Sequence, residues 1–139
     1  MQKSFLLAAM IAFAGMSALA SAGPAQKAVL DHYAASAKAA NPAFTGFSAA
    51  KGQAFFSAKQ AGGQPDTPSC TACHTADPTR AGQTRTGKDI KPMAVSANPE
   101  RFADLVNVEK WFRRNCDTVL GRECTMTEKG DFITFMSAR

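Results

Sequence analysis

The sequence predicts an all-α fold that surrounds a cysteine–histidine motif near the middle of the chain. Helix-forming segments occupy both ends of the 139 residues, and the run Cys70-Thr71-Ala72-Cys73-His74 lies between them. Strand signals are few, because the chain has no alternating β-branched run of useful length and no Asn-Gly or Asp-Gly hairpin pair. The length suits a single domain.

The first 22 residues predict a secretory signal peptide. Lys3 precedes an apolar run from Phe5 to Ala20, which ends in the small residues Ala20-Ser21-Ala22. We therefore expect export to the periplasm and a mature domain of residues 23–139. No other apolar run approaches the length of a membrane span, so we expect no stable membrane insertion after cleavage. The net charge of +5 is small and dispersed, and it does not indicate a nucleic-acid partner.

Two helices are predicted before the motif. The first covers Pro24–Ala40, where Val29, Leu30 and Tyr33 share one face and Asn41-Pro42 stops the helix. The second covers Ser48–Gln60, and in it Gly52 would allow another helix to approach closely.

Two more helices are predicted after the motif. Asn98-Pro99-Glu100 combines an N-cap, a proline in the first turn and an acid, and so predicts a helix from there to Asn115-Cys116. Thr125-Met126-Thr127-Glu128 is a capping-box pattern that predicts a final helix. The polar stretch 75–92 has no clear period, and we expect an extended loop there.

The C-x-x-C-H run is the attachment signal of a c-type haem. Cys70 and Cys73 can each form a thioether with one vinyl group, and His74 then presents its imidazole to the iron as the proximal ligand. We therefore expect one covalent haem c. A thioredoxin-like redox pair, half of a zinc site and a structural bridge are the alternatives. The first lacks a preceding strand, and the second lacks a matching cluster of ligands.

The second pair of cysteines, Cys116 and Cys124, is separated by a segment in which Gly121 permits a turn. In an oxidising compartment the default is a disulfide, which would stabilise the fold by roughly 2–3 kcal/mol in the chain-entropy model. A redox-sensitive clamp on the residue beside Cys116 is the alternative.

Function depends on the residue that occupies the other face of the iron. A methionine would favour an electron carrier, whereas a weak ligand would leave room for O₂, CO or NO. The residues considered are Met93, Met126, Met136, His32 and Asn115. Met136 fits a core position, Met126 lies within the capping box, and His32 suits a solvated or capping position. Composition alone favours Met93, while Asn115 could simply cap the end of its helix.

Several stretches resemble known cytochromes. The run Ala49–Phe56 ahead of C-x-x-C-H resembles the N-terminal helix of class I cytochrome c. The stretch Thr79–Ile90, the run Val108–Cys116 with its Trp-Phe-Arg-Arg-Asn-Cys sequence, and Gly121–Thr125 resemble the sphaeroides haem protein family, a relative of cytochrome c-double-prime. The likeness extends from about Gly62 to the C-terminus.

The resemblance implies a class I cytochrome c-like helical fold and a specific site. It implies that Asn115 is the sixth ligand and that Cys116 and Cys124 form a disulfide. It also implies that the ferrous haem releases Asn115 and binds a diatomic gas (O₂, NO or CO), with electrons delivered by a partner, which we expect to be a c-type cytochrome. Met93 departs from family members that have leucine there, so ligation by Met93 stays open.

Coordination chemistry agrees with release on reduction. An amide binds the softer ferrous ion poorly and the harder ferric ion tolerably, so reduction should loosen Asn115.

Two other functions remain as alternatives. One is a simple periplasmic electron-transfer cytochrome with His74 and Met93 as ligands. The other is secondary chemistry on peroxide or NO at the haem, although no acid-base pair beside the motif indicates an enzyme.

The basic residues of the polar stretch, Arg80, Arg85, Lys88 and Lys91, have three possible roles. They could pair with the haem propionates, dock an acidic redox partner, or remain solvated surface charges.

Overall fold

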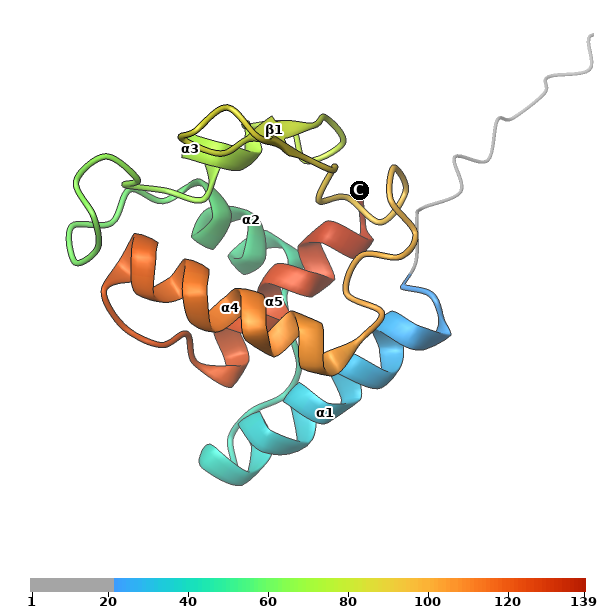
Figure 1. Ribbon diagram of the computed structural model, residues 1–139. Helices are drawn as coiled ribbons and strands as arrows, with labels where there is room; N and C mark the ends of the chain where they lie inside the picture. Colours follow the sequence, from blue (N-terminus) through green and yellow to red (C-terminus); the bar gives the residue numbers. More distant parts are fainter. Residues whose placement is uncertain (1–21) are drawn as a thin grey trace, which may run out of the picture.

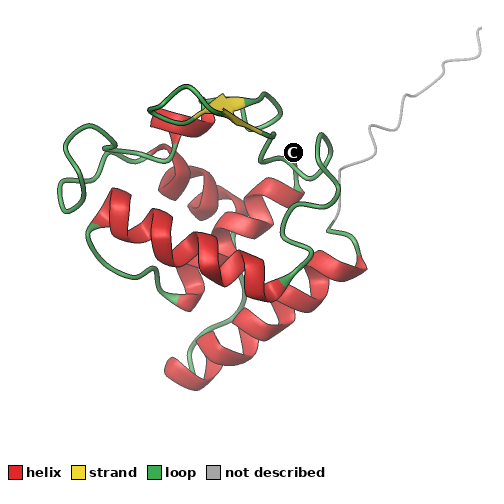
Figure 2. Ribbon diagram, in the orientation of Figure 1, coloured by secondary structure: helices red, strands yellow, loops and turns green. Residues whose placement is uncertain are grey.

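The computed structural model describes residues 22–139. Apart from Ala22, the predicted signal peptide lies outside the described residues. The elements are α1 (Pro24–Ala40), α2 (Ala49–Ser57), α3 (Thr71–His74), β1 (Gly82–Gln83), β2 (Asp89–Ile90), α4 (Leu105–Leu120) and α5 (Met126–Ser137). The all-α prediction is confirmed, and the only sheet within residues 22–139 is the two-residue antiparallel pair β1–β2 (Figure 2).

The C-terminal helix α5 is the centre of the helical packing. Both α1 and α2 pack against it, and Figure 1 shows α4 crossing in front of it (Figure 1). Gly52 lies where α2 meets α5, and a Cβ atom there would overlap the main-chain oxygen of Asp131. The predicted close approach at Gly52 is therefore confirmed. The carboxylate of Asp131 in turn accepts a hydrogen bond of 2.7 Å from the N–H of Ser48, the N-cap residue of α2.

The predicted boundaries of α4 were wrong at both ends. The helix begins at Leu105 because the Asp104 carboxylate accepts a 2.6 Å hydrogen bond from the N–H of Asn107. Asn98 starts no helix. Its side chain donates to the carbonyl of Pro92 instead. At the other end α4 continues past Asn115 to Leu120, where Gly121 adopts a left-handed conformation with φ of 67°.

The other predicted helices differ less from the helices of the structure. α1 has the predicted bounds, and α2 is shorter than predicted, since it ends at Ser57. The capping box at Thr125 and Glu128 is confirmed, because each side chain accepts a hydrogen bond from the other residue's N–H. The stretch expected to be an extended loop contains the β1–β2 pair.

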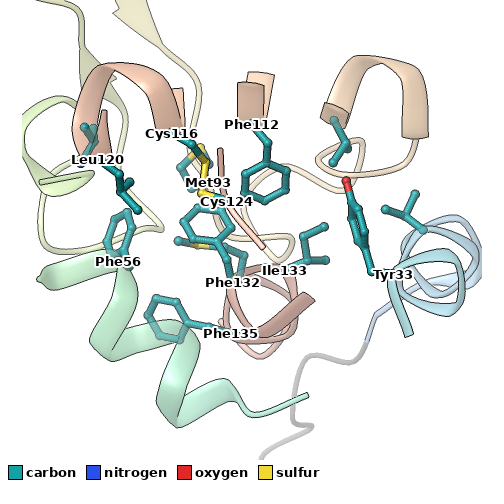
Figure 3. Close-up of a cluster of buried hydrophobic side chains, with 14 residues drawn as sticks. Tyr33, Phe56, Met93, Phe112, Cys116, Leu120, Cys124, Phe132, Ile133 and Phe135 are labelled. Carbon is teal, nitrogen blue, oxygen red and sulfur yellow. A yellow bond between two sulfur atoms is a disulfide. The ribbon is translucent and has the colours of Figure 1, made fainter. Parts of the chain in front are cut away.

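Phenylalanine rings fill the space between the helices (Figure 3). The ring of Phe132 on α5 makes edge contacts with four other rings, at centroid distances between 5.5 and 6.5 Å: those of Phe55, Phe56, Phe102 and Phe112. Figure 3 shows Phe132 with two of them, Phe56 and Phe112. Edge-to-face arrangements of this kind are favourable beyond the apolar area that they bury. This cluster joins α2, α4 and α5 into one core.

A buried polar cluster ties α4 to α1 and α5. The carboxylate of Glu109 accepts hydrogen bonds from the Tyr33 hydroxyl at 2.6 Å and from the Lys129 ammonium at 2.9 and 3.0 Å. Burial raises the pKa of Glu109, but the hydrogen bonds and the charge of Lys129 outweigh it, so the net pKa lies below the ordinary value. Burial and the neighbouring carboxylate raise the pKa of Tyr33.

Among residues 22–139, no helix is long and apolar enough to cross a membrane.

We predict that Glu109→Ala lowers the free energy of unfolding by on the order of 3 kcal/mol, because it leaves the Lys129 ammonium buried without a counter-charge. Urea unfolding of the holo protein measures this. The stabilisation should be present above the pKa of an unfolded Glu, about 4.3, and should be lost as the pH falls through the lower folded value.

Lys27→Ala is the matched control, since it breaks an exposed ion pair with Asp31 on α1. It should cost less than about 0.5 kcal/mol. Equal losses in the two variants would show that Glu109 is no more important than a surface charge.

Candidate functional site

The C-x-x-C-H motif forms the short helix α3. Hydrogen bonds from the N–H groups of Cys73 and His74 to the carbonyl of Cys70 close this single turn. The turn places both thiols and the imidazole along one short piece of chain. Cys70 and Cys73 are free and half-buried. Burial raises the pKa of Cys70 to about 11, the opposite of the activated thiolate that a thioredoxin-like pair needs.

The surroundings of His74 favour its neutral form. Burial, and then the positive charge of Arg101, lowers the pKa of His74 to about 4, so the imidazole is uncharged near neutral pH. Its Nδ1 atom is buried and has no hydrogen-bond partner among the described residues. A metal ligand must be deprotonated in this way.

A cavity of about 740 Å³ opens beside α3. Cys70, Cys73 and His74 line it on one side, and side chains of α4 line it on another. Its walls are mainly apolar and include Phe55, Ile90, Met93, Phe102, Val108, Trp111, Phe112, Val119, Leu120 and Phe132. The size and character match those of an enclosed site for a large planar apolar cofactor. Two free thiols and a neutral histidine at the wall of such a cavity fit a covalent haem.

The cavity contains two of the five residues considered as sixth ligands. Asn115 on α4 and Met93 in the loop after β2 line the cavity, whereas Met126, Met136 and His32 do not. Met136 is fully buried in the core, as expected, and His32 is exposed on α1.

Asn115 and Met93 differ in how they are attached. The N–H groups of Met93 and Ala94 both donate to the carbonyl of Pro78, at 2.9 and 2.8 Å. The backbone of Met93 is therefore held against the loop that follows α3. Asn115 comes from α4, which lies below α3 in the view of Figure 1. Asn115 and Met93 therefore line the same cavity from different parts of the chain.

Cys116 and Cys124 form a disulfide in the structure, with their Cα atoms 5.7 Å apart (Figure 3). Cys116 directly follows Asn115, near the C-terminal end of α4, and Cys124 lies in the segment between α4 and α5. The bond therefore joins that end of α4 to this segment. Both cysteines are buried among the core side chains.

The four basic residues of the polar stretch separate into two groups. Lys88 and Lys91 line the cavity, but Arg80 and Arg85 do not. The guanidinium of Arg85 forms a 2.6 Å ion pair with Asp66 instead.

Among the residues that sequence reasoning missed, Arg101 and Trp111 are the most prominent on the cavity wall. Arg101 is half-buried, and no motif distinguished it from the other arginines. Trp111 entered the sequence analysis only as part of the run that carries the family resemblance. It is 44% exposed and lines the cavity, beneath the cations of Lys110 and Arg114. Its spacing of four residues before Asn115 places both on one helical face, and that spacing was a usable signal.

Comparisons with known proteins agree with this geometry. A protein-family model described as a domain of unknown function (DUF1924) matches residues 42–136. The cytochrome c-type protein SHP of Cereibacter sphaeroides is 58% identical over 91 residues, which cover 66% of this chain and 70% of that protein. Cytochrome c'' of Methylophilus methylotrophus is 36% identical over 120 residues, covering 86% of this chain and 83% of that protein.

Solved structures give the same result. Oxidised SHP, described as an oxygen-binding cytochrome c, matches with a TM-score of 0.76 and 49% identity, over 82% of this chain and 96% of that one. Oxidised cytochrome c'' matches with a TM-score of 0.71 and 33% identity, over 81% and 92%. A solution structure of the same cytochrome, described as giving insights into haem-ligand detachment, matches with a TM-score of 0.70 and 32% identity, over 82% and 93%. The chain therefore belongs to the sphaeroides haem protein family and is a c-type cytochrome with one covalently bound haem c.

Proposed function

We propose that this protein is an exported monohaem cytochrome whose ferrous haem binds a small diatomic gas after Asn115 leaves the iron. In this proposal the signal peptide of residues 1–22 directs the domain of residues 23–139 to the periplasm. O₂, NO and CO are the candidate gases. The oxygen binding of the SHP structure supports this choice, as does the haem-ligand detachment described for cytochrome c''.

Four residues of the cavity wall have distinct roles in this proposal. Cys70 and Cys73 would hold the haem through thioethers, and His74 would bind its iron. The haem supplies an iron that accepts one electron and binds a sixth ligand. Asn115 would occupy the sixth position in the ferric state and would be released on reduction, because an amide is a poor ligand for ferrous iron.

The observation that carries the proposal is the place of Asn115 on the cavity wall formed by α4. Helix α4 is anchored by Glu109 and by the Cys116–Cys124 disulfide, one on either side of Asn115 along the helix. A released Asn115 side chain would therefore stay close to the iron and could rebind on oxidation.

The alternative is an electron-transfer cytochrome with His74 and Met93 as ligands. Met93 lines the same cavity as Asn115, but the resemblance counts against its ligation, because family members can have leucine at this position.

We predict that Asn115→Ala changes the ferric optical spectrum to that of a five-coordinate or water-ligated haem. The matched variant Met93→Leu should keep the wild-type ferric spectrum, since leucine fills the same apolar space without a ligand atom. The reverse pattern, with a wild-type spectrum for Asn115→Ala and an altered one for Met93→Leu, would support the electron-transfer alternative.

The electron donor is proposed to be a c-type cytochrome with an acidic docking surface. Lys88 and Lys91 are exposed at the cavity rim, where they could meet such a surface. We predict that the rate of reduction by an acidic cytochrome falls by about tenfold or more between low and physiological ionic strength. Lys88→Gln combined with Lys91→Gln should lower the rate at low salt and flatten its salt dependence. A salt-independent wild-type rate would argue against docking by charge.

A further inference from the structure

The guanidinium of Arg101 is a half-buried cation at the haem cavity. It lies in the loop between β2 and α4, and it lines the cavity. Its Nε donates to the carbonyl of Pro92 at 3.1 Å, and its Nη2 donates to the carbonyl of Lys91 at 2.7 Å. A guanidinium has five N–H donors, so these two bonds leave three N–H groups free.

No carboxylate within residues 22–139 forms an ion pair with Arg101. Burial accordingly lowers its pKa. The acidic residues that line the same cavity, Asp89 and Glu100, are exposed and make no such pair. A cation that is partly withdrawn from water and lacks a counter-charge is costly, so its persistence here indicates an anion that the polypeptide does not supply.

The fold holds Arg101 firmly. The side-chain amide of Gln26 on α1 is buried and donates to the carbonyls of Pro99 and Arg101, at 2.7 and 2.8 Å. The next residue, Phe102, has a φ of 59°, a conformation that a bulky residue adopts only under strain. These contacts fix the main chain from which the guanidinium extends.

We propose that Arg101 binds a propionate carboxylate of the haem through its free N–H groups. The parallel N–H groups of a guanidinium match a carboxylate in charge and geometry. The ammonium of an exposed lysine matches a carboxylate less well. In the same position Arg101 fixes the Lys91–Pro92 backbone just before Met93. A positive charge at the cavity wall favours the ferrous state of the iron, which carries one positive charge fewer than the ferric state. The proposal depends on haem c in this cavity, and it is independent of gas binding and of Asn115.

Spectroelectrochemical titration of the holo protein tests this role. At the wild-type midpoint potential, Arg101→Gln should lower the ratio of ferrous to ferric protein about tenfold, which is about 59 mV for a one-electron couple. Arg101→Lys keeps the charge but loses the two backbone bonds, and it should lower the ratio much less. The effect should persist at high ionic strength, because partly buried charges are screened weakly.

Arg80→Gln is the matched control, since it removes the same charge from an exposed residue outside the cavity. A midpoint for Arg101→Gln equal to that of the control would overturn the proposal. Equal losses in Arg101→Gln and Arg101→Lys would also overturn it, because they would show that only the backbone bonds matter.

Infrared difference spectra, oxidised minus reduced, give a second test in the Arg101→Lys variant, which keeps the positive charge. With isotope-labelled propionates, the carboxylate bands should shift from their wild-type positions. Unshifted bands would exclude direct contact. Binding of CO by the same ferrous samples reports on the proposed function separately.

Discussion

The Glu109 carboxylate is the contact on which the position of α4 depends. It accepts hydrogen bonds from Tyr33 of α1 and from Lys129 of α5, so one side chain joins three helices. Helix α4 carries the cavity wall that includes Asn115, and the disulfide fixes its last turn. Weakening this contact would allow α4 to move as a unit, and the distance between Asn115 and the haem would then change.

Much of the fold could be predicted because its signals are local. The bounds of α1, the capping box of α5 and the C-x-x-C-H turn all follow from short stretches of sequence. The start of α4 could not be predicted, because two good N-caps compete. Asn98 does not cap a helix, because its side chain donates a hydrogen bond to the carbonyl of Pro92. The side chain of Gln26 also binds the carbonyls of Pro99 and Arg101, which are then not available to a helix.

The site was predictable to a similar degree. The motif and the family resemblance identify Cys70, Cys73, His74 and Asn115 as haem-site candidates, and all four line one cavity. Composition favoured Met93, because methionine is a common sixth ligand of c-type haem and the sequence does not reveal that Asn115 lines the same cavity. Arg101 was missed for the same reason: its burial and its lack of a counter-charge arise only from contacts between distant segments. Side chains whose role depends on long-range packing leave no short-range pattern.

In the proposed function, reduction frees the sixth position of the haem. The optical spectrum of the holo protein, oxidised and then reduced with dithionite, with and without CO, tests this most directly. We predict a high-spin ferrous spectrum that shifts when CO is added. A low-spin ferrous spectrum that CO leaves unchanged, together with a sulfur-to-iron band in the oxidised form, would contradict it and assign the sixth position to Met93.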